Sequence, residues 1–385
     1  MTVRVDVSPE VLLWARNVAS SPADQIEHAF PKFAAWVAGN SRPTVNELVK
    51  FAGRVGVPFG YLLLPEPPAW ELPIPDFREG FGGTPSTPSA NLIDVLNQSL
   101  RRQDWYRDYA LANDLPEVEM VGVASDWNPS QAAADILERL AFNVSSRKGS
   151  WNDTRKYLLR RFEALGGLTV ATSMVGNNTY RPLDPHEFRG FSLVDDLAPL
   201  IFVNSKQTLN GQIFTIAHEL AHIWRRRSGL SDEEPRFVGQ SEVEQWCNAV
   251  ASLVLVPVTD LANHWPKVMQ LPLTRQLDEL ASIFKCGTLV ILQALRRDHL
   301  YVFDDFDVAY STEEARLKKL SEDNSSTSPG GDHYNNQPFR VGERLSRAVI
   351  GDTFEGRTTF TEAMSLMSMK SATSFDEYAR RLGVA

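Results

Sequence analysis

The sequence predicts a mostly helical α+β fold, and three observations lead to this prediction. Most of the chain places apolar residues three and four positions apart, which is typical of amphipathic helices. Three short apolar runs near the middle lack that spacing and predict strands at 166–172, 188–193 and 200–204. A helix-compatible run with histidines at positions 218 and 222 follows at once. We therefore expect a small sheet followed by a helix that carries functional residues.

Length and composition limit the possible functions. A chain of 385 residues is long enough for two or three domains. Its net charge of −9 does not favour strong binding of polyanions by the chain as a whole. The only cysteines are Cys247 and Cys286, which favours a reducing cytoplasm over a disulfide framework. The N-terminus lacks a signal-peptide core and no apolar run reaches the length of a membrane span, so we expect no membrane partner.

Residues 1–64 predict a small helical domain. Ser8 followed by Pro9 is the preferred order at a helix start, an N-cap residue and then proline. Further helices are expected at 23–30, 31–38 and 44–55. The segment from Trp36 to Thr44 resembles the W-x-x-G-x-x-x-P-[ST] signature of XRE-type helix-turn-helix domains. That resemblance implies a bundle that reads DNA in the major groove.

The charge of this N-terminal module gives DNA binding little support. Six basic residues face five acidic ones, whereas a DNA reader normally carries a basic footprint. Lys32, in the expected recognition helix, and Arg42, just after it, are the candidate DNA contacts. The alternative is a helical module used for dimerisation or for docking a protein.

Residues 65–90 form a Pro/Gly-rich linker, with prolines at 65, 67, 68, 73 and 75 that predict an extended, semi-rigid chain. The P-I-P-D-F-R run at 73–78 could pack on the following domain or simply tether it. Residues 91–165 predict a helical region with helices at 91–111, 126–141 and 151–165. In the first of them, Arg101 to Gln103 beside aromatic residues could form a basic patch, but a solvated helix face is the favoured interpretation.

An H-E-x-x-H motif is formed by His218, Glu219 and His222. Two histidines four positions apart lie on one face of a helix and can bind one Zn²⁺. Glu219 lies just off that face, in the position of a general base that acts on a metal-bound water. The alternative is two ordinary histidines, but apolar neighbours indicate burial, and burying these groups costs several kcal/mol unless they are paired or metal-bound.

A third ligand is expected from the helix predicted at 241–257. Glu244 is the candidate ligand, and Asn248, one turn further on the same face, could hold a ligand in place from behind. Glu242 is the alternative, although it faces away from Asn248. The acidic residues at 232–234 lie in a polar loop and favour a solvated turn.

These segments resemble the ImmA/IrrE family of metallopeptidases. The run F-T-I-A-H-E-L-A-H-I-W, then E-x-x-x-N, an apolar run and a proline, carries the resemblance, as does the segment 188–204. It implies a zincin-like metallopeptidase domain over 166–300, with Glu219 as catalytic base and three Zn²⁺ ligands: His218, His222 and Glu244. Cys247 stands where the family often has alanine. Family members are linked to prophage, mobile-element and stress regulation, and several cleave or relieve a transcriptional repressor.

The remaining chain, 301–385, predicts a C-terminal helical region with helices at 341–349, 361–369 and 375–382 and a flexible loop at 321–332. The preceding segment 277–295 has helix-turn-helix shape, but polar groups for reading bases are scarce and favour packing. His333 or Tyr334, after the loop, could swing in to stabilise an oxyanion. Plain surface-loop residues are the favoured interpretation.

Three functions are compatible with these features. The first is a zinc-dependent endopeptidase whose protein substrate is a specific intracellular regulator, such as a repressor. The second is a zinc-fold regulator that binds DNA or a protein without cleaving it. The third is a toxin–antitoxin-like regulator that binds an operator through residues 1–64 and uses proteolysis as a switch. The complete set of ligand and base residues favours the first, with an edge strand near the motif binding an extended substrate.

Overall fold

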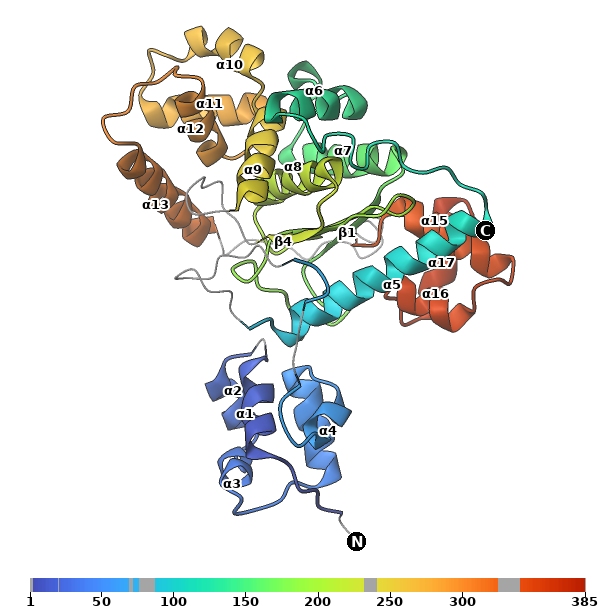
Figure 1. The fold of residues 1–385 in the computed structure, drawn as a ribbon. Coiled ribbons are helices and arrows are strands. Elements are labelled where there is room, and N and C mark those ends of the chain that lie inside the picture. Colours follow the sequence, from blue (N-terminus) through green and yellow to red (C-terminus); the bar gives the residue numbers. More distant parts are fainter. Residues whose placement is uncertain are drawn as a thin grey trace.

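A computed structural model describes residues 3–19, 21–68, 72–75, 87–231, 241–324 and 340–384. Figure 1 shows a small N-terminal lobe and a larger body in which a sheet lies between two helical layers. The sheet has four strands and the remaining elements are helices, so the predicted mostly helical α+β fold is confirmed.

The N-terminal lobe is a helical bundle with its own core, built around the buried side chains of Leu12, Trp36 and Phe51. Its fourth helix starts at a capping box between Thr44 and Glu47, which satisfies two amide groups of the first turn. The third helix is shorter than predicted because residues 31 and 32 form a turn instead. The elements are α1 (Pro9–Asn17), α2 (Ala23–Ala29), α3 (Phe33–Val37), α4 (Val45–Val55) and η1 (Phe59–Leu63).

The sheet has the strand order β1-β3-β2-β4. Its strands are β1 (Leu168–Thr172), β2 (Gly190–Leu193), β3 (Leu200–Asn204) and β4 (Gly229–Ser231). Strand β1 runs parallel to β3, and β2 runs antiparallel to both β3 and β4. The first three strands lie within the ranges predicted. Strand β4 was not predicted, since three residues are too few for an alternation to be recognised.

The two faces of the sheet pack into different cores, as the alternation along β3 shows. Ile201 and Val203 belong to one core, and Leu200 and Phe202 to the other. The first core joins the sheet to α6 (Pro129–Leu140), η2 (Val144–Ser146), α7 (Trp151–Ala164), α8 (Leu209–Arg225), α9 (Glu242–Leu255), α10 (Val258–His264), η3 (Trp265–Lys267), α11 (Leu273–Phe284), α12 (Thr288–Arg297) and α13 (Phe306–Asn324). The second joins it to α5 (Ala90–Ala112), α15 (Glu343–Phe354), α16 (Phe360–Leu366) and α17 (Ala372–Leu382).

Helix α5 is buried more widely than the sequence predicted. It packs against β3 and against the C-terminal helices α15 and α16, so the interpretation of Arg102 and Gln103 as part of a solvated face is wrong. Arg102 Nε donates to the Leu366 carbonyl at 2.8 Å. Gln103 Nε2 donates at 2.9 Å to the carbonyls of Leu193 and Ala198, so its amide ties the helix to the end of β2.

Each edge of the sheet forms a hydrogen bond with a segment outside the sheet. At β4, the Leu230 amide donates to the carbonyl of Pro75 at 3.1 Å. At β1, the Thr169 carbonyl accepts from the amide of Gly342 at 2.8 Å. Ile74 is only 8% exposed and belongs to the core beneath the sheet. The P-I-P part of the linker therefore packs on the body rather than merely tethering it, whereas residues 76–78 lie outside the described residues.

The C-terminal part of the chain largely follows the prediction. Helices α11 and α12 bury apolar residues such as Leu280 and Ile291 in the first core, which supports packing over DNA reading. Helix α13 continues to Asn324, so residues 321–324 of the predicted flexible loop are helical, and the rest of that loop lies outside the described residues. Among the helices that the structure describes, none is by itself long and apolar enough to cross a membrane.

Candidate metal centre

Helix α8 carries the H-E-x-x-H motif and is buried almost all round. The Thr208 hydroxyl caps its first turn by accepting from the Gly211 amide at 3.2 Å. Every residue from Gln212 to Trp224 is buried, because α8 packs on the sheet, on α7 and on α9. The helix ends at Arg226, which adopts a left-handed conformation with φ of 59°. The motif is therefore in the protein interior rather than on a surface helix.

Helix α9 brings Glu244 to the motif. Its N-cap is Ser241, whose hydroxyl accepts from the Glu244 amide at 3.3 Å and fixes the first turn. Glu244 is 1% exposed and faces α8, whereas Glu242 is exposed to solvent. Glu242 therefore does not reach the histidines. The other alternative ligands, at 232–234, lie outside the described residues.

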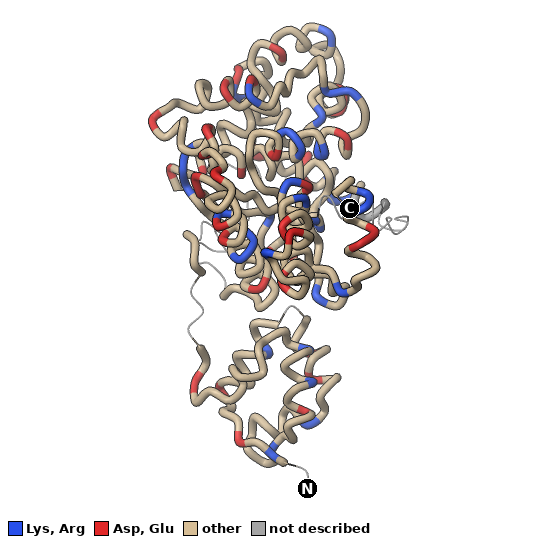
Figure 2. Tube along the Cα trace, turned by 90° about the vertical axis from the view of Figure 1, so that its right-hand side faces the viewer, with Lys and Arg blue, Asp and Glu red and all other residues tan. Residues whose placement is uncertain are grey.

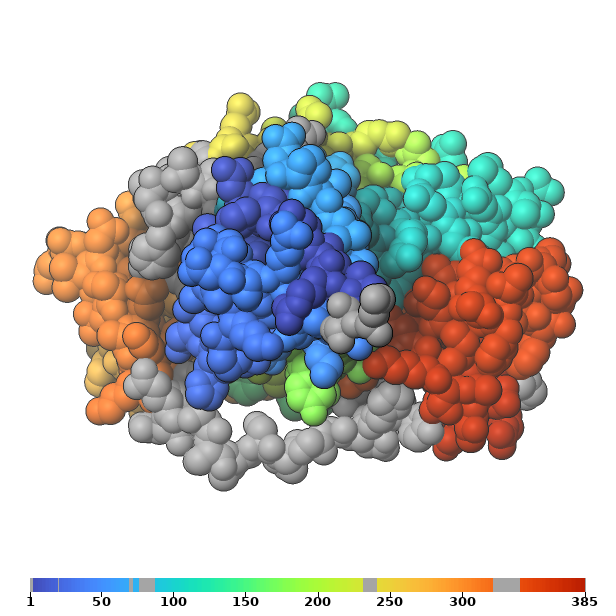
Figure 3. Space-filling view, turned by 90° about the horizontal axis from the view of Figure 1, so that it is seen from below, coloured from blue at the N-terminus to red at the C-terminus, as the bar shows by residue number. Residues whose placement is uncertain are grey.

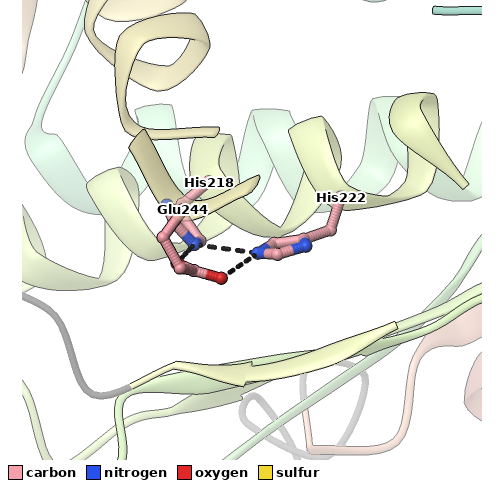
Figure 4. Close-up of side chains that lie close together, drawn as sticks. All are labelled: His218, His222 and Glu244. Carbon is pink, nitrogen blue, oxygen red and sulfur yellow. Dashed lines mark hydrogen bonds and ion pairs between the residues drawn. The ribbon is translucent and has the colours of Figure 1, made fainter. Parts of the chain in front are cut away.

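The side chains of His218, His222 and Glu244 converge on one point (Figure 4). His218 Nε2 lies 3.0 Å from Glu244 Oε2, and His222 Nε2 lies 3.1 Å from Glu244 Oε1. The two Nε2 atoms are 3.1 Å apart. The histidines come from successive turns of α8 and the glutamate from α9, so the packing of these two helices creates the cluster. We call these three residues the metal cluster.

Hydrogen bonds behind the rings fix the orientation of both histidines. His218 Nδ1 lies 2.9 Å from Asn248 Oδ1, and His222 Nδ1 lies 3.1 Å from the carbonyl oxygen of Arg227. A carbonyl oxygen can only accept, so each Nδ1 carries a proton, and in its neutral form each ring points a lone pair from Nε2. Two lone pairs and a carboxylate then face one another, an arrangement that a bound cation would stabilise.

Burial and charge act in opposite directions on Glu244. Burial by itself would raise the pKa of its carboxyl group, but the positive charge that the two adjacent histidines carry when protonated outweighs burial and holds this pKa well below its ordinary value. The carboxylate therefore stays ionised despite being almost completely buried, which is the state that a metal ligand requires.

The spacing of the three ligand atoms fits a tetrahedral metal ion. Ions held at about 2.0–2.1 Å by nitrogen and oxygen, as Zn²⁺ is, separate neighbouring ligand atoms by roughly 3.3 Å in a tetrahedron. The observed separations of 3.0 to 3.1 Å are close to this value. Three protein ligands would leave a fourth position open, as catalytic zinc sites do. The cluster could therefore hold a metal ion.

Glu219 lies beside the metal cluster and is fully buried. Its surroundings depend on Gly190, at the start of β2, which the sequence analysis did not single out. A Cβ on Gly190 would lie 2.5 Å from Thr215 Cγ2, 2.8 Å from the Phe202 carbonyl oxygen and 3.0 Å from Glu219 Oε1. Only glycine allows α8 to approach the sheet this closely. A glycine in an otherwise apolar predicted strand is the sequence feature that could have indicated this close approach.

The other predicted site residues do not join this cluster. In the N-terminal module, Lys32 Nζ lies 3.0 Å from Glu47 Oε1, and Arg42 Nη2 lies 3.3 Å from Asp6 Oδ2. Figure 2 shows basic and acidic residues interspersed over this lobe rather than a basic face. The suggested oxyanion stabilisers, at 333 and 334, lie outside the described residues.

Comparisons with known proteins agree with this location of the site. Residues 164–296 match the family described as an IrrE N-terminal-like domain, Peptidase_M78. Residues 341–381 match a domain of unknown function (DUF8813). No curated protein matches the chain. The first match supports the ImmA/IrrE family and indicates a metallopeptidase domain of that type, within which the entire metal cluster lies.

Proposed function

We propose that this chain is a zinc-dependent endopeptidase that cleaves a specific regulator protein, such as a repressor, in the cytoplasm. One observation carries the proposal: three buried metal-binding groups from α8 and α9 lie 3.0 to 3.1 Å apart, with Glu219 on the same helix. The match of residues 164–296 to a metallopeptidase family supports the same activity.

Each residue of the site would have a distinct role. His218, His222 and Glu244 would hold Zn²⁺, which when bound supplies a Lewis acid that lowers the pKa of water and polarises a carbonyl group. Glu219 would accept a proton from the attacking water and deliver it to the leaving amine. Asn248 would keep the His218 ring in the orientation and tautomer that a ligand needs, as the Arg227 carbonyl does for His222.

The edges of the sheet support selective cleavage rather than general digestion. Extended substrates commonly bind by adding a strand to an exposed sheet edge. In this protein the Leu230 amide at the β4 edge already donates to Pro75 of the linker. A peptide binding at that position would have to displace the linker segment. A partner that docks elsewhere on the protein could supply the free energy for this displacement, whereas an arbitrary unfolded chain could not.

The N-terminal module gives better support to protein docking than to DNA reading. Both candidate DNA contacts, Lys32 and Arg42, lie next to carboxylates that neutralise them. Neither family match includes residues 1–64. We therefore propose that this module selects the protein partner. A regulator that binds DNA or a partner without cleavage, toxin–antitoxin-like, is the alternative that the following experiment distinguishes.

The test uses the full-length Glu219→Gln variant as a trap for the substrate. This variant should keep the metal but lose the base, so it should capture a partner in cells that the wild-type protein cleaves. The purified partner should then be cut by the wild-type protein at one or a few sites, and a chelator should abolish cutting. Casein should be a poor substrate.

Glu138→Gln is the matched control, because Glu138 is an exposed glutamate on α6 and its amide should leave cleavage unchanged. A wild-type protein that holds the metal yet leaves the trapped partner intact would favour the non-catalytic regulator. Rapid cleavage of casein would contradict the proposed selectivity.

A further inference from the structure

A small pocket lies where the C-terminal helices meet the sheet and α5. It is lined by the apolar side chains of Val170 on β1 and Phe202 on β3. Its polar lining residues come from all three parts of the fold: Gln98, Arg102, Thr172, Asn177, Arg340 and Ser368. We call this site the arginine pocket.

Two arginines, Arg102 and Arg340, belong to this lining, and no carboxylate of the described residues pairs with either. Arg102 is 4% exposed, and it donates only to neutral groups, the Leu366 carbonyl and the Ser368 hydroxyl, each at 2.8 Å. Arg340 is half-buried and donates from Nη1 to Asn177 Oδ1 at 2.6 Å. Within the described part of the chain, no carboxylate forms an ion pair with either arginine, and none lines the pocket.

Burial disfavours the charged form of both guanidinium groups, and their pKa values are lowered as a result. Burial, with a smaller contribution from Arg101, lowers the pKa of Arg102 to about 10. Burial likewise lowers the pKa of Arg340. Placing two cations in an apolar setting is unfavourable unless an anion balances them.

Arg147 shows what a purely structural buried arginine looks like in this protein. Its guanidinium donates to four main-chain carbonyls, those of Phe142, Val254, Leu255 and Phe284, and it stacks on the ring of Phe142. It does not line the arginine pocket. Arg102 has half as many acceptors and lines the pocket. Hydrogen bonds to neutral protein groups therefore do not explain its burial as fully as they explain the burial of Arg147.

The neutral groups around the two arginines are held in a strained arrangement. Ser368 adopts a left-handed conformation with φ of 52°, which is unfavourable for a residue with a Cβ. Its hydroxyl accepts from Arg102, and its carbonyl accepts from the Asn177 amide, which in turn accepts from Arg340. A chain of hydrogen bonds thus positions both guanidinium groups toward one small space.

We propose that the arginine pocket binds a phosphoryl group and that the bound group holds the C-terminal helices on the sheet. Two guanidinium groups are balanced by one dianion, whereas a carboxylate would balance only one of them. Guanidinium forks also match the geometry of phosphate oxygens. The group is either free phosphate or the terminal phosphate of a larger molecule that enters from the open side.

The test measures binding of inorganic phosphate to the full-length protein by calorimetry and thermal unfolding, in a buffer low in phosphate and chloride. Phosphate should bind saturably and raise the Tm, while acetate and chloride at equal ionic strength should do neither. Arg340→Gln should weaken phosphate binding about ten- to hundredfold, the effect of losing one strong charge-assisted hydrogen bond. Arg102→Gln should abolish binding, but it removes packing contacts as well, so the decision rests on Arg340→Gln.

Arg347→Gln is the matched control, since Arg347 lies on α15 and pairs with Glu343 in solvent, outside the pocket. It should bind phosphate like the wild-type protein. Nucleotides form a second arm: tighter binding of ATP than of phosphate would identify a nucleotide as the source, and equal or weaker binding would identify free phosphate. Equal stabilisation of wild type, Arg340→Gln and Arg347→Gln would mean a general salt effect on the protein and would overturn the proposal, as would no wild-type binding at millimolar phosphate.

Discussion

The two faces of the sheet bury opposite kinds of unbalanced charge. Above it, the metal cluster brings two histidine lone pairs and a carboxylate to one point, and a cation would complete it. Below it, the arginine pocket brings two guanidinium groups together without a described carboxylate, and an anion would complete it. Strand β3 lies between them, with Ile201 facing the first core and Phe202 facing the second. In both places the proposed ligand would compensate the buried charge.

The two sites differ in which parts of the chain build them. The metal cluster comes from two adjoining helices of one domain, α8 and α9, and its orientation is fixed from behind by Asn248. The arginine pocket joins α5, the sheet and the C-terminal helices, which are far apart in sequence. Figure 3 shows the C-terminal helices (red) adjoining the segment that includes α5 (cyan), in agreement with Figure 1. A substitution in the first site should therefore act through loss of the metal, and a substitution in the second should weaken the packing of the C-terminal helices on the sheet.

The largest effect is expected from removing one ligand of the metal cluster. Glu244→Ala should reduce bound zinc from about one per chain to nearly none, because it leaves two ligands and removes the negative charge. Elemental analysis of the purified protein measures this directly. A chelator should lower the Tm of the wild-type protein and leave that of Glu244→Ala unchanged, since only the former has metal to lose.

Glu242→Ala is the matched control for Glu244→Ala, because it removes an exposed carboxylate two residues away on the same helix. It should keep the full zinc content. Full zinc retention in Glu244→Ala would contradict the ligand assignment and direct attention to the acidic residues at 232–234.

The next effect concerns the pH dependence of stability, and it tests the contact of α7 with β1 and with the start of α15. Burial raises the pKa of Glu163 to about 7, with its carboxyl group accepting from the Thr169 hydroxyl at 2.6 Å, next to the start of α15. The folded state therefore keeps this proton between an unfolded-state pKa of 4.5 and about 7, and the unfolded state does not. Stability should fall as the pH rises through this window, by about 3 kcal/mol at most.

Glu163→Gln should flatten this part of the stability curve, because an amide cannot ionise. Urea unfolding at a series of pH values from about 5 to 8 compares the variant with the wild-type protein. The variant should be the more stable of the two above pH 7 and similar near pH 5. An unchanged slope in Glu163→Gln would show that another group causes the pH dependence.

A smaller effect is expected from Gly190, which lies in the sheet between the two sites. Gly190→Ala should destabilise the protein by about 1–3 kcal/mol, since its Cβ would press on Thr215 and on the Phe202 carbonyl. It should also reduce any cleavage by shifting Glu219, while the metal ligands stay in place. Unfolding, zinc content and partner cleavage are measured on the same preparation.

Gly53→Ala is the control for this substitution. Gly53 lies inside α4 and a Cβ there would meet no atom within 4 Å. Alanine should stabilise that helix by up to about 1 kcal/mol. A Gly190→Ala protein with wild-type stability would mean that α8 can move away from the sheet, contrary to the tight contact described above.

Most of the fold followed from local patterns in the sequence. The apolar spacing along α5, α7 and α9 placed these helices to within a residue or two, and Ser8 followed by Pro9 marked where α1 begins. The pattern failed where it was too short, as for β4, or where a polar residue was buried, as for Arg102. The spacing of apolar residues predicts that a polar residue between them is exposed to solvent. Whether another layer packs over that residue and buries it is visible only in the tertiary structure.

The sequence by itself determined that His218 and His222 share one face of a helix, because a spacing of four residues is a local property of the α-helix. Only the tertiary structure decided that Glu244, and not Glu242, meets them, since this depends on how α9 packs against α8. The same holds for Gly190 beneath Glu219 and for the two arginines on the opposite face of the sheet. Contacts between distant segments depend on packing geometry, which no local spacing records.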